Sequence, residues 1–309
     1  MRDYHGLLCI GDPHLEARQP GFRKDDYPAA ILGKIEWILE YARTESLLPA
    51  FLGDIFDKPR DNPTWLLSRL IDLLKGREVI GIYGNHDCAD PVLSEADSLM
   101  LLFKAGLIRR ISEDEPWTGA MGGKTVSVGG ASYREPIPRS VTHQADHSIW
   151  LTHHDLILPG YEEQGRIAPR EIAGVDLVVN GHIHRELETQ RHGRTVWMTP
   201  GNISRRSRSD AVREHVPSVL RIDVHEKLTM QRVTVPHRPF EEVFHELVTE
   251  DQIVLGESAF VTGLAELQSR RTDAGAGLLA FIEKNAVQFE PEVAQTIADL
   301  AAEVTGGRE

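Results

Sequence analysis

Five times along this chain, a short apolar run ends in a polar signature that carries Asp, Asn or His. The signatures are GDPH from residue 11, GDIFD from residue 53, GNHD from residue 84, THHD from residue 152 and GHIH from residue 181. An apolar run that breaks into a polar turn is typical of a buried strand entering a loop. Because the carboxyl ends of parallel strands share one edge of a sheet, we expect these signatures to gather at one site.

The first part of the chain alternates between strand and helix patterns. Apolar runs at residues 7–10, 50–52 and 79–83 predict strands, and residues 29–43 and 65–74 place apolar side chains at helical spacing. This alternation indicates an α/β fold with parallel strands.

The following part is richer in short β-branched runs. They predict strands at residues 125–130, 148–152, 177–180, 195–199, 218–224 and 227–235, the last two forming a hairpin around His225 and Glu226. We therefore expect an α/β fold in which two packed sheets, a β-sandwich, are flanked by helices.

The sequence changes character near residues 236–239. We predict a catalytic domain at residues 1–238 and a small, acidic, mostly helical element at residues 239–309, with helical patterns at 258–271, 277–287 and 291–304. The apolar faces of these helices either pack against the first domain or dock a second subunit or another copy of the chain. The pattern leaves both open.

The charge of the chain is unevenly distributed. Its net charge is −13, but residues 241–309 alone carry 14 Asp and Glu against 4 Lys and Arg. The first 240 residues therefore have a net charge of only −3. Overall charge does not exclude a nucleic-acid partner, because the charge near a site matters more than the total.

The apolar runs are all short. None approaches the roughly 20 residues that span a bilayer, and the first residues have no signal-peptide pattern. We expect a cytoplasmic protein with no membrane partner. Cys9 lies in an apolar run and Cys88 directly follows GNHD. One disulfide is arithmetically open, but two reduced thiols suit a cytosolic protein better.

The signatures supply the atom types of a metal centre. Asp-x-His in an extended loop directs two side chains the same way, because side-chain direction alternates along extended backbone. The seven candidate ligands are Asp12, His14, Asp54, Asn85, His153, His182 and His184, with His154 as the alternative to His153. Carboxylate, amide and imidazole without thiolate suit Mn, Fe or Zn, and Mg is tolerated. Seven ligands are too many for one ion and suit two if a carboxylate bridges them, which makes Asp54 the natural bridge.

Two adjacent divalent cations favour phosphoester hydrolysis. Such a pair clamps a phosphate, lowers the pKa of a bound water and stabilises the developing charge, so that a metal-bound hydroxide attacks phosphorus. His86, beside Asn85, is expected to contact the phosphate or protonate the leaving oxygen, and Asp87 to orient His86.

The order of the signatures resembles the calcineurin-like metallophosphoesterase superfamily, over about residues 5–235. Its pattern is D-x-H, G-D-x-x-D, G-N-H-D/E, a later His and G-H-x-H. The resemblance implies one ion held by Asp12, His14, Asp54 and His184, and a second held by Asp54, Asn85, His153 and His182. It also implies that His86 is catalytic.

Two later elements are similar to the SbcD-like DNA repair nucleases. Pro200-Gly201 follows the last signature and Arg238-Pro239-Phe240 follows the last predicted strand, where that family has Pro-Gly-Ser and Arg-Pro-Phe. The resemblance implies a manganese-dependent endo- or exonuclease on DNA, with an SMC-type (SbcC-like) ATPase as a partner. This chain differs in having Asn202 after the Pro-Gly pair, and only about 70 residues follow Arg238.

An arginine cluster follows the Pro-Gly turn. Arg205, Arg206, Arg208 and Arg213 lie in a region expected to rim the metal site, where guanidinium groups contact phosphates, and the first three are the predicted substrate-binding residues. The alternative is a solvated loop paired with the acidic C-terminal element. Two other functions stay open: a small-molecule phosphodiesterase or phosphatase of the same superfamily, and a non-catalytic scaffold on this fold.

Overall fold

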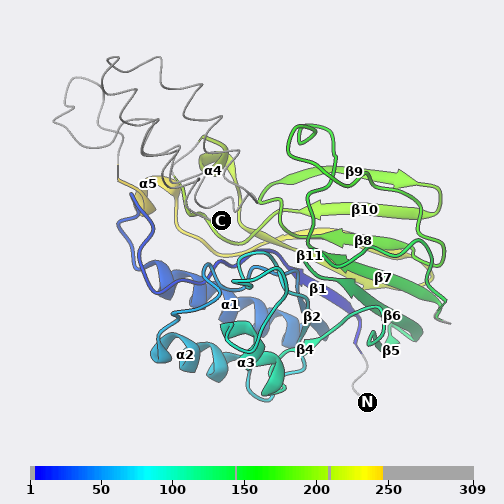
Figure 1. The fold of residues 1–309 in the computed structure, drawn as a ribbon, viewed down its shortest axis with the longest axis horizontal. Helices are drawn as coiled ribbons and strands as arrows, with labels where there is room; N and C mark the ends of the chain where they lie inside the picture. Colours follow the sequence, from blue (N-terminus) through cyan, green and yellow to red (C-terminus); the bar gives the residue numbers. More distant parts are fainter. Residues whose placement is uncertain (1–3, 143–144, 208–209, 246–309) are drawn as a thin grey trace, which may run out of the picture. The chain divides into compact units, whose positions relative to one another are not determined.

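The computed structural model describes residues 4–142, 145–207 and 210–245, and its described part is built on two six-stranded mixed sheets (Figure 1). The first sheet has the order β12-β11-β1-β2-β3-β4. Its strands are β1 (Gly6–Ile10), β2 (Leu47–Phe51), β3 (Ile80–Gly81), β4 (Arg109–Arg110), β11 (Ser218–Val224) and β12 (Leu228–Thr234). Strands β1 to β4 pair in parallel, whereas β11 pairs antiparallel with β1 and β12.

The second sheet has the order β5-β6-β7-β8-β10-β9. Its strands are β5 (Trp117–Met121), β6 (Lys124–Ala131), β7 (His147–Thr152), β8 (Leu177–Asn180), β9 (Glu186–His192) and β10 (Thr195–Pro200). The central strands β6, β7, β8 and β10 pair in parallel, and the outer strands β5 and β9 pair antiparallel. The central strands therefore end at one edge of this sheet.

Helices cover the outer face of the first sheet (Figure 1). They are α1 (Tyr27–Thr44), α2 (Thr64–Leu74) and α3 (Ser98–Lys104), and the short helices α4 (Asp210–Glu214) and α5 (Phe240–Val243) come later in the chain. Helix α1 begins where the Asp26 side chain accepts a hydrogen bond from the Ala29 N–H at 3.0 Å, with Pro28 in its first turn. Its apolar face is buried against the sheet.

Strand β1 shows how the layers are joined. Leu8 and Ile10 pack with the helices, while Leu7 and Cys9 pack in the core between the two sheets. All four side chains are fully buried because successive residues of a strand face opposite sides of the sheet. A third core covers the outer face of the second sheet, where Trp150 packs with apolar residues of the loops that follow β6 and β7.

The predicted α/β fold of two packed sheets flanked by helices is confirmed. The predicted strands and the two predicted helices are all present, and β11 and β12 form the expected hairpin around His225 and Glu226. Strands β4, β5 and β9 and helices α3, α4 and α5 are additions to the prediction. Strand β9 has mostly exposed polar residues, so it lacks the apolar pattern that marks the other strands.

The chain divides into two units, residues 1–245 and 246–309. The predicted helical patterns at 258–271, 277–287 and 291–304 lie outside the described residues, and the predicted boundary after residue 238 stays a prediction. Both cysteines are free and buried, as expected of reduced thiols. In the described part of the chain, no helix combines the length and apolarity needed to cross a bilayer.

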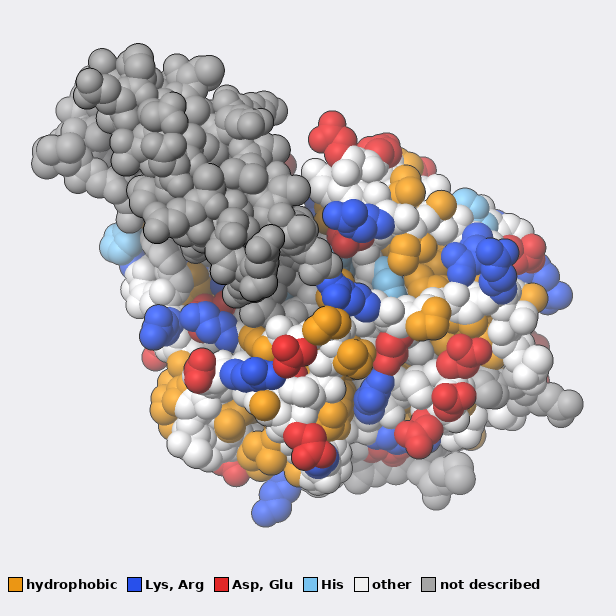
Figure 2. Space-filling view, in the orientation of Figure 1, with side chains coloured by type: hydrophobic (Ala, Val, Ile, Leu, Met, Phe, Trp, Pro, Cys, Tyr) orange, Lys and Arg blue, Asp and Glu red, His pale blue; other side chains and the backbone are white. Residues whose placement is uncertain are grey.

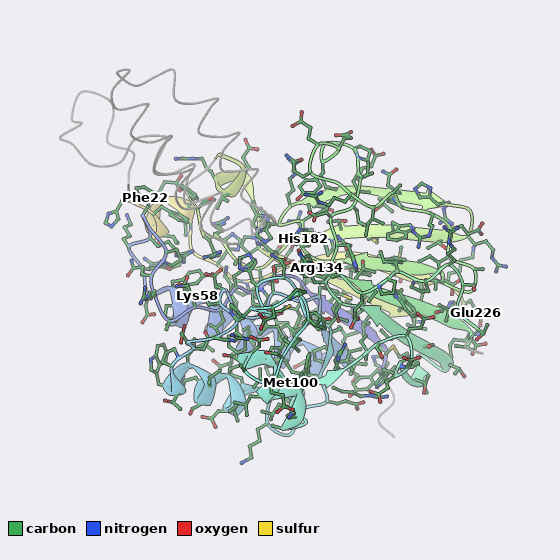
Figure 3. The ribbon with its side chains drawn as sticks, viewed as in Figure 1. Phe22, Lys58, Met100, Arg134, His182 and Glu226 are labelled. Carbon is green, nitrogen blue, oxygen red and sulfur yellow. The ribbon has the colours of Figure 1, made fainter. Side chains whose placement is uncertain are left out.

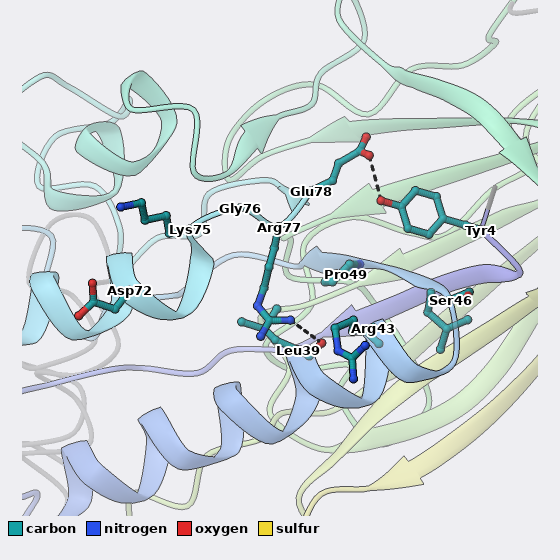
Figure 4. Close-up of a pocket in the computed structure, with 12 residues that line it drawn as sticks. Tyr4, Leu39, Arg43, Ser46, Pro49, Asp72, Lys75, Gly76, Arg77 and Glu78 are labelled. Atoms are coloured by element: carbon teal, nitrogen blue, oxygen red, sulfur yellow. Dashed lines mark hydrogen bonds between the residues drawn. The ribbon is translucent and has the colours of Figure 1, made fainter. Parts of the chain in front are cut away.

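A cavity of about 610 Å³ lies by the amino ends of β1 and β2, between the ends of α1 and α2 (Figure 4). The Tyr4 hydroxyl donates to Glu78 Oε2 at 2.9 Å, and the Arg77 guanidinium donates to the carbonyls of Leu73 and Leu39 at 3.0 and 3.3 Å. These polar groups satisfy one another within the wall, so the cavity is explained as part of the packing of α1 and α2 on the sheet.

Candidate metal centre

The seven predicted ligands meet at the carboxyl ends of the strands. Asp12 and His14 follow β1, Asp54 follows β2, Asn85 follows β3, His153 follows β7, and His182 and His184 follow β8. Figure 3 shows His182 near the centre of the described side chains. Each side chain thus comes from a loop whose start is fixed by a buried strand, as expected for a site at the strand ends.

The backbone turns sharply at these loops. Asp12, His14, Asp54 and His182 have φ of 42°, 47°, 48° and 70°. Residues other than Gly avoid this left-handed region, at a cost of order 1–3 kcal/mol each, and such residues cluster at functional sites. These four residues adopt a strained backbone conformation, and this conformation directs their polar side chains to one site.

Two glycines of the signatures permit the close approach. A Cβ at Gly84 would lie 2.1 Å from Asp54 Oδ1, and a Cβ at Gly53 would lie 2.5 Å from His153 Nδ1. Gly53 also has a φ of +97°. The Gly that opens GDIFD and the Gly that opens GNHD are therefore required by the packing of Asp54 and His153.

Four of the candidate ligands form a first group, consisting of Asp12, His14, Asp54 and His184. One donor atom of each lies within 4.8 Å of the others. His14 Nε2 is 2.9 Å from His184 Nε2 and 3.7 Å from Asp54 Oδ2. Two carboxylates and two imidazoles at this spacing match the donor types and number that borderline divalent ions take.

The second group consists of Asp54, Asn85, His153 and His182. Donor atoms of Asp54, His153 and His182 lie within 4.8 Å of one another. Asn85 Oδ1 is 2.9 Å from His182 Nδ1 and 3.2 Å from His153 Nε2, and Asp54 Oδ2 is 3.3 Å from His153 Nε2. Asp54 belongs to both groups, which is the arrangement of a bridging carboxylate.

The polar atoms at the centre fit a divalent cation. Asp12 Oδ2 and Asp54 Oδ2 are buried and have no hydrogen-bond partner among the described residues. Isolated buried carboxylate oxygens are strongly unfavourable unless a positive charge faces them. The donor atoms of this centre and the burial of its carboxylates therefore suit the binding of a divalent metal ion.

The pKa values of the buried groups reflect the same need for positive charge. Burial raises the pKa of Asp12 to about 7, and the Asp54 carboxylate adds to this. Burial alone would lower the pKa of His153, but the Asp54 and Asp12 carboxylates and the Leu52 carbonyl together outweigh it and raise that pKa to about 9. Without cations, protons compensate the carboxylates, and cation binding would displace them.

In three of the four imidazoles of the site, the nitrogen that points away from the centre faces an oxygen. His153 Nδ1 lies 2.7 Å from the Leu52 carbonyl, and His182 Nε2 lies 2.8 Å from Asp155 Oδ1. His14 Nδ1 lies 3.4 Å from Asp57 Oδ1. Such oxygens fix the ring orientation of a metal-ligating histidine. Asp155 was not predicted as a site residue, although it is the last residue of THHD.

His86 lies at the rim of the groups, with its backbone N–H donating to Asp54 Oδ1 at 2.8 Å. Its ring Nδ1 is 2.9 Å from the Asp57 carbonyl and 3.5 Å from Asp57 Oδ1. The role predicted for Asp87 was to orient His86, but the structure places it otherwise. Asp87 is fully buried and accepts hydrogen bonds from the N–H groups of Phe56 and Gly84 at 3.0 and 2.9 Å. Asp87 thereby joins the loop that follows β2 to the loop that follows β3. The residue that faces the His86 ring is Asp57.

His154 points away from both groups, since its Nε2 lies 2.9 Å from the Glu135 carbonyl. Of the two adjacent histidines, the structure brings His153 to the centre.

The predicted substrate-binding arginines occupy different places. Arg205 is buried, and its guanidinium donates to the carbonyls of His215 and Arg238. Arg206 approaches the site, with Nη1 2.6 Å from Asp57 Oδ1. Arg208 lies outside the described residues. Arg213 pairs with Glu241 on the surface, so among the described arginines of this cluster Arg206 is the one that lies beside the metal groups.

Two packed mixed sheets whose strand ends carry buried carboxylates together with buried and partly exposed imidazoles define a metal-dependent phosphoesterase. The chain belongs to the calcineurin-like phosphoesterase family, whose model matches residues 6–186. No curated protein matches the sequence.

Several solved structures are similar to the chain. A hypothetical protein from Thermus thermophilus has 13% identity and a TM-score of 0.44, covering 74% of this chain and 99% of that protein. A conserved uncharacterized protein of Streptococcus pneumoniae, a predicted phosphoesterase, has 13% identity and a TM-score of 0.34, covering 74% and 88%. Vps29 of Chaetomium thermophilum has 13% identity and a TM-score of 0.33, covering 77% and 100%.

Proposed function

We propose that this protein is a two-metal phosphodiester hydrolase that cleaves DNA. The sharing of Asp54 between the first and second groups carries the two-metal part of the proposal. One buried carboxylate that reaches both groups supports two adjacent cations, as in sites that act on both the attacking and the leaving oxygen of a phosphoester.

The chain supplies the remaining functions through its own side chains. Bound cations would polarise the phosphate and lower the pKa of water. His86 is held at the rim through its backbone N–H, and its ring is half-buried rather than enclosed. From there it is placed to contact a phosphate oxygen or to protonate the leaving oxygen. Asp57 holds the ring by its carbonyl oxygen at 2.9 Å.

The choice of DNA is supported by local features. Positive and negative side chains are interspersed over the face of the molecule in Figure 2, so recognition of a phosphate chain would depend on a few residues. Arg206 lies beside the site, and the resemblance of Pro200-Gly201 and Arg238-Pro239-Phe240 to elements of the SbcD-like nucleases supports the same choice. An SMC-type ATPase and a homodimer are the partners that belong to this proposal, and Mn²⁺ is its proposed cation.

The test is an activity screen on the full chain. Labelled single-stranded and double-stranded DNA, with blunt, recessed and closed circular forms, would be incubated with Mn²⁺, Mg²⁺, Zn²⁺ or a chelator. Bis-p-nitrophenyl phosphate would be tested in parallel as a small phosphodiester. Asp54→Asn removes the shared carboxylate charge, and Asp114→Asn, an exposed carboxylate elsewhere, is the matched control.

We expect the wild-type protein to cleave DNA with Mn²⁺. This activity should be lost with chelator and in Asp54→Asn but kept in Asp114→Asn. Turnover of the small phosphodiester without DNA cleavage would exclude the nuclease and leave a small-molecule phosphodiesterase. Absence of both activities, with fewer than one ion bound per chain, would point to a non-catalytic scaffold.

A further inference from the structure

We propose that Asp155 is a positioning residue that fixes the His182 ring with Nδ1 toward the second group and thereby sets the affinity of that group for its cation. The inference rests on the proposed two-metal site. It concerns a residue that no signature pattern assigns to the metals.

Each nitrogen of the His182 ring faces an oxygen. Nε2 lies 2.8 Å from the carboxylate oxygen Asp155 Oδ1, whereas Nδ1 lies 2.9 Å from the amide oxygen Asn85 Oδ1 and 3.3 Å from His153 Nε2. A charged carboxylate accepts a stronger hydrogen bond than a neutral amide oxygen does, so Asp155 favours the tautomer with its proton on Nε2. In that tautomer the Nδ1 lone pair is directed into the second group, where a cation would need it.

His182 needs this support more than its neighbour does. The His153 side chain is fully buried and its Nδ1 faces a backbone carbonyl, whereas the His182 side chain is 17% exposed. The backbone of His182 is fixed, because its N–H donates to Asp12 Oδ1 at 2.8 Å. Only the ring is left to be oriented, and Asp155 is the described residue that bonds its outer nitrogen.

The backbone of Asp155 is itself held in place. The Asp155 carbonyl accepts hydrogen bonds from the N–H groups of Arg166 and Ile167 at 2.8 and 3.0 Å, which closes the loop that follows His153 and His154. The next residue, Leu156, is fully buried in the same core as Ile183, which directly follows His182. The loops that carry Asp155 and His182 are therefore anchored to one another.

A ring contact limits the remaining freedom of His182. Tyr133 stacks on the imidazole, with ring centroids 6.3 Å apart and an interplanar angle of 27°. Stacking restrains the tilt of the imidazole but does not distinguish its two nitrogens. The choice of nitrogen therefore falls to Asp155.

The experiment compares Asp155→Ala and Asp155→Asn with wild type and with Glu163→Ala, which removes an exposed carboxylate in the same loop. Mn²⁺ binding to the metal-free full chain would be measured by titration calorimetry and by the electron paramagnetic resonance signal of free Mn²⁺. We expect two ions in wild type and in Glu163→Ala. In Asp155→Ala one of the two ions should bind about 10–100-fold more weakly, the usual effect of losing such an outer partner.

Asp155→Asn retains an oxygen that accepts from Nε2, so it should lose less affinity than Asp155→Ala. Hydrolysis of bis-p-nitrophenyl phosphate by Asp155→Ala should recover as Mn²⁺ is raised, with kcat approaching wild type. Equal binding of both ions in Asp155→Ala and wild type would overturn the inference and leave the two-metal site standing. Failure of wild type itself to bind two ions would instead defeat the proposed function.

Discussion

The guanidinium of Arg206 lies 2.6 Å from the carboxylate of Asp57, measured from Nη1 to Oδ1. Asp57 is buried, and its carboxylate also faces the rings of His14 and His86 at 3.4 and 3.5 Å. Burial raises the pKa of Asp57, but His14 and Arg206 outweigh it and hold that pKa well below its usual range. Arg206, which was expected to contact substrate, is thus paired with Asp57. Asp57 in turn faces His86, the proposed catalytic histidine.

Arg206→Gln should therefore lower kcat more than it raises KM. The substitution leaves a buried carboxylate without its charged partner, which destabilises the protein by about 1–3 kcal/mol and loosens the setting of His86. Kinetics on a phosphodiester and urea unfolding measure the two effects. Arg213→Gln is the control, since Arg213 pairs with Glu241 on an exposed surface where ion pairs contribute at most about 1 kcal/mol. A rise in KM alone would assign Arg206 to substrate contact instead.

His86→Ala should lower turnover severely and leave both cations bound. The ring bonds to the Asp57 carbonyl and lies outside the first and second groups, although His14, Asp57 and His86 form a third candidate group. A residue that transfers a proton contributes about 10²–10⁴-fold to the rate, so the loss should fall in that range. Metal analysis and single-turnover kinetics test both parts, with the exposed His225→Ala as control. Loss of an ion from His86→Ala would make His86 a ligand.

The signatures predicted the fold and the gathering of the candidate ligands for a physical reason. Asp12, Asp54 and His182 each follow a buried strand, and buried strands have a strong apolar pattern that fixes where their loops begin. Strand β9 lacks that pattern because its residues are mostly exposed. The sequence pattern therefore does not predict strand β9.

Side-chain partners were harder to predict than strand ends. The Arg206–Asp57 pair joins residues 149 positions apart, and the burial of Arg205 depends on the carbonyls of His215 and Arg238. Asp155 follows a predicted ligand by two positions, yet its bond to His182 depends on how its loop closes onto residues 166 and 167. The local sequence pattern does not predict how a loop closes onto distant residues. These contacts can therefore be identified only from the structure.

Divalent cations should raise the melting temperature of the chain. The buried oxygens Asp12 Oδ2 and Asp54 Oδ2 accept no hydrogen bond from the described residues, so a cation that binds the folded form would face them and stabilise that form. At 100 times its dissociation constant an ion adds about 2.7 kcal/mol per site. For a domain of this size that corresponds to about 5–10 °C. Calorimetric scans with Mn²⁺ and with chelator measure it. Asp54→Asn should lose most of the response and Asp114→Asn none, and a response equal in both variants would contradict the site.

Lys34 makes stability depend on pH at a point away from the metals. Its side chain is buried on α1, and its Nζ donates to the Ile203 carbonyl at 2.6 Å. Burial lowers the pKa of Lys34 to about 7, and the guanidinium groups of Arg23 and Arg205 add to this, while Asp25 opposes it. The unfolded chain keeps the proton up to about pH 10.4. Between these values the unfolded state binds more protons, so raising the pH stabilises the fold.

Lys34→Met should accordingly be more stable relative to wild type near pH 6 than near pH 10. The buried ammonium destabilises wild type fully below about pH 7, and this penalty is relieved as pH rises at about 1.4 kcal/mol per unit. The lost hydrogen bond to Ile203 is the same at every pH, so it shifts the difference without changing its slope. Urea unfolding of both proteins from pH 6 to 10 measures the difference. Exposed Lys75→Met should give a flat difference, and an equally flat result for Lys34→Met would show that Lys34 stays charged in the folded protein.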